Sequence, residues 1–126
     1  MGGTGAQPHE ENAIVMPQPP QVPTVDVHAV NTGSVLLDVR EPDEYTAGHV
    51  PGALHIPMGA IPTRLPEIPD DARLVVVCRS GGRSARVTAY LRNEGLDAVN
   101  LDGGMRAWAA AGKALSSEDG RPPRII

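Results

Sequence analysis

Short apolar runs alternate with segments of helical pattern along most of the chain, and this alternation restricts the fold more than any other feature of the sequence. The four main runs are SVLLDV (34–39), ALHIP (53–57), RLVVVC (73–78) and AVNLD (98–102), and a shorter PTV (23–25) precedes them. Continuous apolar runs of this length are typical of strands that are covered on both faces. Because helical patterns separate them, the sequence predicts βαβ units and a parallel sheet.

The helix candidates lie between these strands. They are a turn or two after Asp26, then 41–48, a piece around 61–65, 83–94, and a last one from Gly104. In 83–94, Ser84, Val87 and Leu91 recur at the spacing of one helix face, which predicts a face that lies close on the sheet. Gly95 and Gly112 stand where helices commonly end in the left-handed conformation.

The length of the chain, 126 residues, suits one domain and is too short for two independent cores. Residues 1–21 are rich in Gly, Pro, Gln and Glu without a sustained period, so we expect a flexible tail there. We expect one domain at 22–114 and a second tail at 115–126, where Pro122 and Pro123 exclude a helix.

Charge and cysteine content narrow the class of partner and the compartment. The net charge is −4, with no basic cluster or aromatic ladder, so we expect no nucleic-acid partner. No segment approaches the roughly 18 apolar residues of a membrane span, and no basic stretch with an apolar run follows the N-terminus, so we expect no membrane partner. The single cysteine, Cys78, has no partner for an internal disulfide, which fits a reducing compartment. We therefore predict a cytoplasmic location.

The stretch VVVCRSGGRS (75–84) places Cys78 at the end of an apolar run, before a glycine-containing loop and a helix that begins near Arg83. The carboxyl ends of parallel strands are where open α/β sheets bind ligands. Backbone amides of a tight loop and the N-terminus of a helix together form a cradle for an anion. We predict that the anion is the Cys78 thiolate, with a lowered pKa. The alternative is a buried cysteine that only fills space.

The spacing between Cys78 and Arg83 limits the size of the anion. Thiol-dependent phosphatases have one more residue between the corresponding Cys and Arg, and one residue fewer removes about 3.5 Å of chain from the ring. The smaller cradle favours a single sulfur atom over a tetrahedral phosphate.

Three motifs together resemble the rhodanese family of sulfurtransferases. They are LLDVREPDEYTAGHVPGALHIP (36–57), RLVVVCRSGGRS (73–84) and AVNLDGGMRAW (98–108), and the resemblance covers roughly 24–112. It implies a three-layer α/β domain with a five-stranded, mainly parallel sheet and helices on both faces. It also implies that Cys78 is the catalytic, sulfur-accepting residue. The loop that binds the transferred sulfur would comprise Arg79, Ser80, Gly81, Gly82, Arg83 and Ser84.

The resemblance implies transfer of a sulfane sulfur from thiosulfate, or from another persulfide donor, through a persulfide on Cys78. The acceptor would be cyanide in an assay or a thiol in the cell, and no metal or organic cofactor would be needed. A second hypothesis is a sulfur-carrier or regulatory module that acts with a protein persulfide partner. A third is an arsenate reductase or phosphatase. The short loop and the lack of a second cysteine argue against this hypothesis.

Four charged residues in or near the loop are candidates for roles in the site, and two of them have an alternative interpretation. Arg79 and Arg83 are suited to attract an anionic donor, and for Arg83 the alternative is a pair with a nearby carboxylate. Asp38 ends a neighbouring strand and Arg40 follows two residues later, and we expect both at the same rim. The resemblance implies that Asp38 supports the loop geometry, and for Arg40 a local pair with Glu44 is the alternative.

Other polar or aromatic residues are predicted to be structural. His49 precedes a Pro-Gly turn and is expected to bond backbone or solvent, and the histidines and Cys78 lack metal-ligand spacing. Asp102 is expected to cap the helix that begins at Gly104, and Trp108 to anchor the core.

Overall fold

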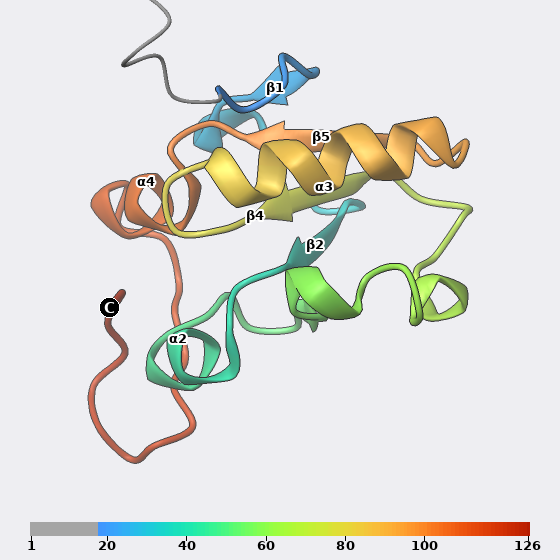
Figure 1. Ribbon diagram of the computed structural model, residues 1–126. Helices are drawn as coiled ribbons and strands as arrows, with labels where there is room; N and C mark the ends of the chain where they lie inside the picture. Colours follow the sequence, from blue (N-terminus) through green and yellow to red (C-terminus); the bar gives the residue numbers. More distant parts are fainter. Residues whose placement is uncertain (1–17) are drawn as a thin grey trace, which may run out of the picture.

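The computed structural model describes residues 18–126; most of the tail predicted at 1–21 lies outside this range. The described chain forms a five-stranded sheet with helices on both faces (Figure 1). The strands are β1 (Thr24–Val25), β2 (Val35–Asp38), β3 (Leu54–His55), β4 (Leu74–Val77) and β5 (Ala98–Leu101). The α-helices are α2 (Pro42–Ala47), α3 (Gly82–Asn93) and α4 (Gly104–Ala110), and the 3-10 helices are η1 (Val27–Ala29), η2 (Met58–Ala60) and η3 (Leu65–Glu67).

The sheet is parallel throughout, in the order β1-β5-β4-β2-β3. The register sets Val76 of β4 opposite Leu37 of β2 on one side and opposite Asn100 of β5 on the other. The predicted α/β fold with a five-stranded parallel sheet and helices on both faces is therefore confirmed. Each observed strand is shorter by one to three residues than the apolar run that predicted it.

The central strand β4 explains why continuous apolar runs predicted the sheet. All four of its residues are buried. Leu74 and Val76 pack in the core on the α3 face, whereas Val75 and Val77 pack with Trp108 and Met105 of α4 on the opposite face. Because both faces are covered, alternation of apolar and polar residues is absent from this strand.

Helix α3 lies across the sheet, over β4 and β5 (Figure 1). Its predicted inner face is confirmed, since Ser84, Val87 and Leu91 are buried and Arg86 is exposed. The helix ends as expected, with Gly95 following it at a φ of +90°.

Two local predictions are wrong. The helical piece expected at 61–65 is replaced by η2 and η3 on either side of hydrogen-bonded turns. Pro62 and Pro66 lack the amide donors that a continuous helix would need there. Asp102 does not cap α4. The N-cap residue is Gly103, at a φ of +74°, which has no side chain that could form a capping hydrogen bond.

Residues 115–126, predicted as a tail, contain no helix or strand and pack along α2 (Figure 1). Four backbone hydrogen bonds attach this segment. His49 and Ser116 exchange two of 2.8 Å, Glu118 N–H donates to Thr46 O (2.9 Å), and Arg124 N–H donates to Ala47 O (3.0 Å). Between residues 18 and 126, no helix has the length and apolar character to cross a membrane.

Candidate active site

The loop from Cys78 to Gly81 connects the carboxyl end of β4 to α3, as the sequence predicted. Gly81 precedes the helix with a φ of +118°, a backbone conformation that L side chains rarely adopt. The Gly81 amide faces back toward Cys78. The Cys78 residue is 1% exposed at the base of the loop.

The Cys78 sulfur receives hydrogen bonds from two groups of the loop. The Gly81 amide donates to Sγ at 3.1 Å and the Ser84 hydroxyl lies 3.2 Å from Sγ. Burial raises the pKa of the Cys78 thiol, but the Ser84 hydroxyl and the amides of Ser84, Gly81 and Ser80 lower it by more, so the net pKa is lowered. The loop therefore favours a thiolate, as its sequence predicted.

The start of α4 holds the same loop from the other side. The Met105 amide donates to Cys78 O at 2.8 Å, and the Arg106 amide donates to Arg79 O at 3.1 Å. Gly104 permits this approach, because a Cβ there would lie 2.5 Å from Cys78 O and 2.8 Å from Arg79 O. Sequence reasoning missed this role, although two successive glycines after β5 were a signal for a close backbone approach.

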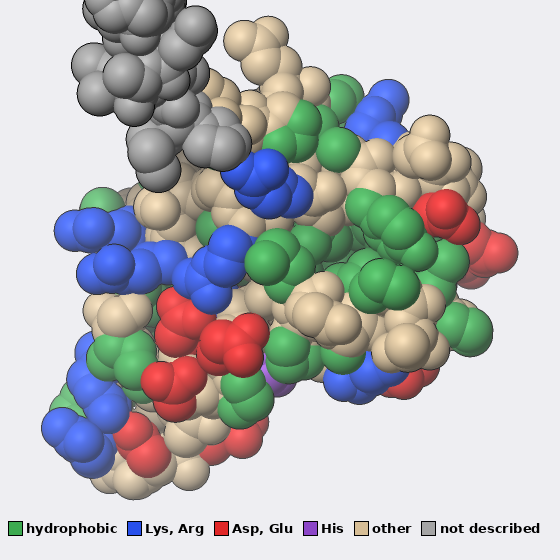
Figure 2. Space-filling view, in the orientation of Figure 1, with side chains coloured by type: hydrophobic (Ala, Val, Ile, Leu, Met, Phe, Trp, Pro, Cys, Tyr) green, Lys and Arg blue, Asp and Glu red, His purple; other side chains and the backbone are tan. Residues whose placement is uncertain are grey.

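Arg83 is paired with a carboxylate, which was the alternative interpretation of this residue. Its guanidinium donates to both oxygens of Glu44, at 2.7 and 2.8 Å. The bond from Arg83 lowers the pKa of Glu44 to about 2, against a raising effect of burial. Figure 2 shows basic and acidic side chains adjoining beside the N-terminal end of α3. Glu44, from α2, is a site residue that the sequence did not reveal.

Arg79, a residue of the loop, is exposed. Among residues 18–126, no carboxylate forms an ion pair with its guanidinium. Of the two arginines expected to attract an anionic donor, Arg79 is thus the one without a carboxylate partner in the described part of the chain.

Asp38 ends β2 beside the end of β4, at the same rim of the sheet as the loop, as expected, but both Asp38 and Arg40 are fully buried. They pair with each other, with Arg40 Nη2 2.7 Å from Asp38 Oδ2, and Arg40 also donates to Gly48 O at 2.8 Å. The alternative pair of Arg40 with Glu44 is wrong. Asp38 is opposite Val77, the residue before Cys78, so the pair lies beside the strand end from which the loop starts.

The histidines near the site have structural partners. His49 Nδ1 lies 2.8 Å from Tyr45 O, and His55 Nε2 lies 2.8 Å from Arg40 O. The Tyr45 ring stacks between the two imidazoles, with centroid distances of 3.9 and 4.2 Å. The backbone bond predicted for His49 is confirmed. In the described part of the chain, no three His, Cys, Asp or Glu side chains are grouped to hold a metal ion.

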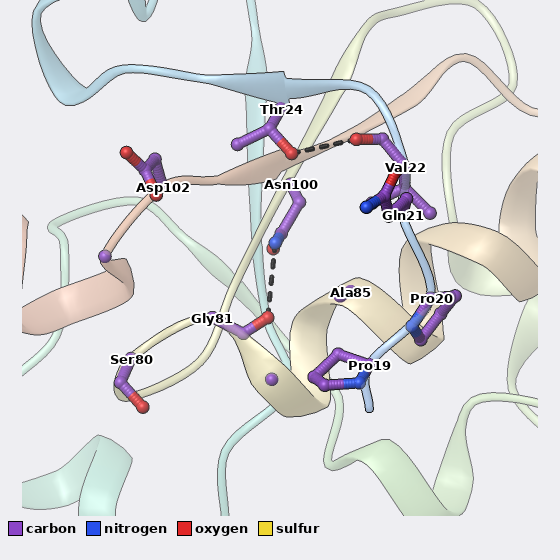
Figure 3. A pocket seen from close by; sticks show the side chains of 12 residues that line it. Pro19, Pro20, Gln21, Val22, Thr24, Ser80, Gly81, Ala85, Asn100 and Asp102 are labelled. Carbon is purple, nitrogen blue, oxygen red and sulfur yellow. Dashed lines mark hydrogen bonds between the residues drawn. The ribbon is translucent and has the colours of Figure 1, made fainter. Parts of the chain in front are cut away.

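A groove of about 500 Å³ lies behind the loop, on the side of β1 and β5. Figure 3 shows Asn100 of β5 in this groove with its amide nitrogen directed at Gly81 O, a distance of 3.2 Å. Pro19 to Val22, which precede β1, and Thr24 of β1 line the groove across from the loop. Asn100 is thus a second contact to the loop that sequence reasoning did not single out.

Comparisons with known proteins agree with this architecture. The profile of the Rhodanese-like domain family matches residues 26–111. A sulfurtransferase of Allochromatium vinosum is 45% identical over 87 residues, which are 68% of this chain and 81% of that protein. A putative sulfur carrier protein of Bacillus subtilis, YrkF, is 38% identical over 74 residues, which are 58% of this chain and 40% of that protein.

A solved structure has the same fold. The rhodanese-related protein of Thermoplasma volcanium superimposes with a TM-score of 0.73 and 26% identity, over 75% of this chain and 98% of that one.

Proposed function

The chain belongs to the family of rhodanese-like domains, and from this we propose that it is a sulfurtransferase that carries a sulfane sulfur as a persulfide on Cys78. The observation that carries the proposal is the environment of Sγ, which accepts hydrogen bonds from the Gly81 amide and the Ser84 hydroxyl. A buried thiol with such donors is suited to react as the anion.

In the first half-reaction, the Cys78 thiolate attacks the outer sulfur of thiosulfate. A bond forms between Sγ and that sulfur, the bond to the sulfonate sulfur breaks, and sulfite leaves with the electron pair. The product is a persulfide anion on Cys78. The amides of the loop and the positive end of the α3 dipole would stabilise the terminal sulfur, as they stabilise the thiolate.

In the second half-reaction, a thiophilic acceptor attacks the terminal sulfur. Cyanide would form a carbon–sulfur bond while the sulfur–sulfur bond breaks, which releases thiocyanate and restores the Cys78 thiolate. A cellular thiol would accept the sulfur in the same way and become a persulfide. Neither half-reaction requires a metal or an organic cofactor.

Arg79 is proposed to attract the anionic donor, because its guanidinium is exposed and carries no carboxylate partner among the described residues. Asp38 and Arg40 are proposed to support the strand end before Cys78. The cytoplasmic location predicted from the single cysteine is retained as part of the proposal.

The test is the intact mass of the protein after incubation with thiosulfate and removal of the excess donor, beside the Cys78→Ser variant. One added sulfur atom on the parent, absent from the variant and released by cyanide as thiocyanate, is the expected result. If the folded protein gains no sulfur from thiosulfate, thiosulfate is excluded as the donor. Residual transfer by Cys78→Ser would refute the role of Cys78.

A second candidate function is a sulfur carrier that receives its sulfur from a protein persulfide. The Glu44–Arg83 pair favours it, because it neutralises one of the two arginines that would attract thiosulfate. The name of the Bacillus subtilis relative points in the same direction. Transfer from a persulfidated protein at a rate far above the thiosulfate rate would support the carrier, and equal rates would support the enzyme. An arsenate reductase or phosphatase would instead turn over arsenate or an aryl phosphate.

A further inference from the structure

The hydroxyl of Ser84 has one proton and two acceptors at the same distance. Its oxygen lies 3.2 Å from Cys78 Sγ and 3.2 Å from Gly81 O. A hydroxyl donates one hydrogen bond at a time. Whether the thiolate keeps this donor therefore depends on how strongly Gly81 O competes for the proton.

Two N–H groups already donate to Gly81 O. The amide of Ala85, in the first turn of α3, lies at 3.0 Å, and Asn100 Nδ2 lies at 3.2 Å (Figure 3). A carbonyl oxygen has two lone pairs, so these donors occupy both. The orientation of the Asn100 amide follows from chemistry, since only its NH₂ group can face a carbonyl oxygen.

Asn100 is an unusual residue for its position. It lies on β5, whose four residues are all buried, and it is 7% exposed on the face that α3 covers. Its Oδ1 atom is buried with no hydrogen-bond partner in the described residues. An unpaired buried amide oxygen is unfavourable, so an apolar side chain would serve packing better. The one bond that the side chain makes, to Gly81 O, is therefore the feature that requires an explanation.

We propose that Asn100 is a positioning residue that occupies the Gly81 carbonyl and thereby directs the Ser84 hydroxyl proton to the sulfur of Cys78. Without the Asn100 donor, Gly81 O regains a free lone pair, and the Ser84 hydroxyl turns toward it. The sulfur then loses a donor and the thiolate is less stable. The proposal rests on the proposed function only in requiring Cys78 as the reacting group.

The test is the ionisation of Cys78, measured as the pH dependence of its alkylation by iodoacetamide and by thiolate absorbance, in a double-mutant cycle. The variants are Asn100→Leu, Ser84→Ala and the double variant. We expect Asn100→Leu to raise the apparent pKa of Cys78 and to slow alkylation several-fold at neutral pH. In the Ser84→Ala background, Asn100→Leu should have no further effect, because the hydroxyl proton of Ser84 that Asn100 directs is absent.

Asn100→Ala repeats the cycle with a smaller side chain in case leucine does not fit, and thermal unfolding checks that each variant is folded. Thr24→Val is the matched control. Thr24 lines the same groove but its hydroxyl donates to Val22 O, so alkylation should be unchanged. The proposal is overturned if Asn100→Leu and Asn100→Ala leave the pKa unchanged, or if they shift it equally with and without Ser84.

The measurement contains no sulfur donor, so it separates this proposal from the proposed function. A Cys78 that takes no sulfur from thiosulfate, yet shows the Ser84-dependent effect of Asn100, would refute thiosulfate transfer and support the positioning role. A Cys78 that forms the persulfide, but ionises independently of Asn100, would support thiosulfate transfer and refute the positioning role.

Discussion

Glu44 compensates the charge of Arg83 with two hydrogen bonds, so it is expected to weaken the attraction of the site for anionic donors. In Glu44→Gln, the guanidinium of Arg83 keeps its full charge near Cys78. We expect the KM for thiosulfate to fall several-fold, with a stronger dependence on salt than in the parent, because exposed charges are screened by ions. Steady-state kinetics at low and high ionic strength measure both effects.

The control for this substitution is Glu67→Gln. Glu67 pairs with Arg64 within an exposed turn of η3, at 2.8 Å, and that pair has no contact with the loop. Its loss should leave the KM unchanged. A higher KM in Glu44→Gln would contradict the prediction and would mean that Glu44 holds Arg83 in a productive position.

The same ion pair should appear in the pH dependence of stability. The pKa of Glu44 is about 2 in the folded protein, against an ordinary value of 4.5. A carboxylate with a lowered pKa stabilises the fold fully above its unfolded pKa, and this contribution is lost as the pH falls through the folded pKa. The contribution is at most about 3 kcal/mol at neutral pH, less after solvent screening.

Urea unfolding of the parent and of Glu44→Gln, at a series of pH values, measures this contribution. The difference in unfolding free energy should be constant above pH 4.5 and decrease toward zero near pH 2. A difference that does not change with pH would show that the glutamine variant loses packing or helix capping and not an ion pair.

Single residues were predictable from the sequence where the chemistry is local. Cys78, Gly81 and Ser84 lie within seven residues of one another, and their order predicted a loop that cradles sulfur. The partner of Arg83 was not predictable, because Glu44 is 39 positions away and two pairings were open to it. Only the packing of α2 beside the loop decides between Arg40 and Arg83.

Secondary-structure elements were predicted best where hydrophobic patterning is continuous. The run 73–78 predicted β4 correctly, because both faces of the sheet are covered there. The helical spacing of Ser84, Val87 and Leu91 predicted the face of α3 that contacts the sheet. The helical piece predicted around 61–65 was wrong, because Pro62 and Pro66 interrupt a helical pattern and leave only two 3-10 helices on either side. The contact of α4 with the active loop was not predicted, since it depends on how closely two backbones approach.

That contact predicts the effect of Gly104→Ala. The new Cβ would lie 2.5 Å from Cys78 O, and Gly104 has a φ of +58°. We expect a loss of stability of roughly 2 to 4 kcal/mol and a strong loss of sulfur transfer, because the loop must move to relieve the overlap. Thermal unfolding and the persulfide mass assay measure the two effects.

Gly112→Ala is the matched control for the backbone strain alone. Gly112 has a φ of +73°, but a Cβ there would meet no atom within 4 Å. It should cost about 1 kcal/mol and leave transfer unchanged. Equal losses of activity in the two variants would mean that the strained φ, and not the contact with the loop, is responsible.

At the scale of the whole molecule, the C-terminal segment 115–126 packs along α2. The segment 115–126 donates backbone hydrogen bonds to Thr46 and Ala47, in the last turn of the helix that carries Glu44, and exchanges two with His49, just after that helix. Gly48 is extended, at a φ of −177°, so its own backbone would accept any side chain. A Cβ at Gly48 would nevertheless overlap the backbone of Arg124, 2.7 Å from its nitrogen and closer to its oxygen.

Gly48→Ala is therefore expected to destabilise the protein by displacing the C-terminal segment, which lowers the melting temperature by about 5 °C or more. In a chain that ends at Glu118, Arg124 is absent and the same substitution should have no cost. Gly59→Ala is the control in both lengths, because a Cβ there meets open space at an ordinary φ. If Gly48→Ala is equally harmful in the shortened chain, the cost arises within α2 and the segment does not pack on it. A cost confined to the full chain would link the C-terminal segment to α2, whose Glu44 pairs with Arg83.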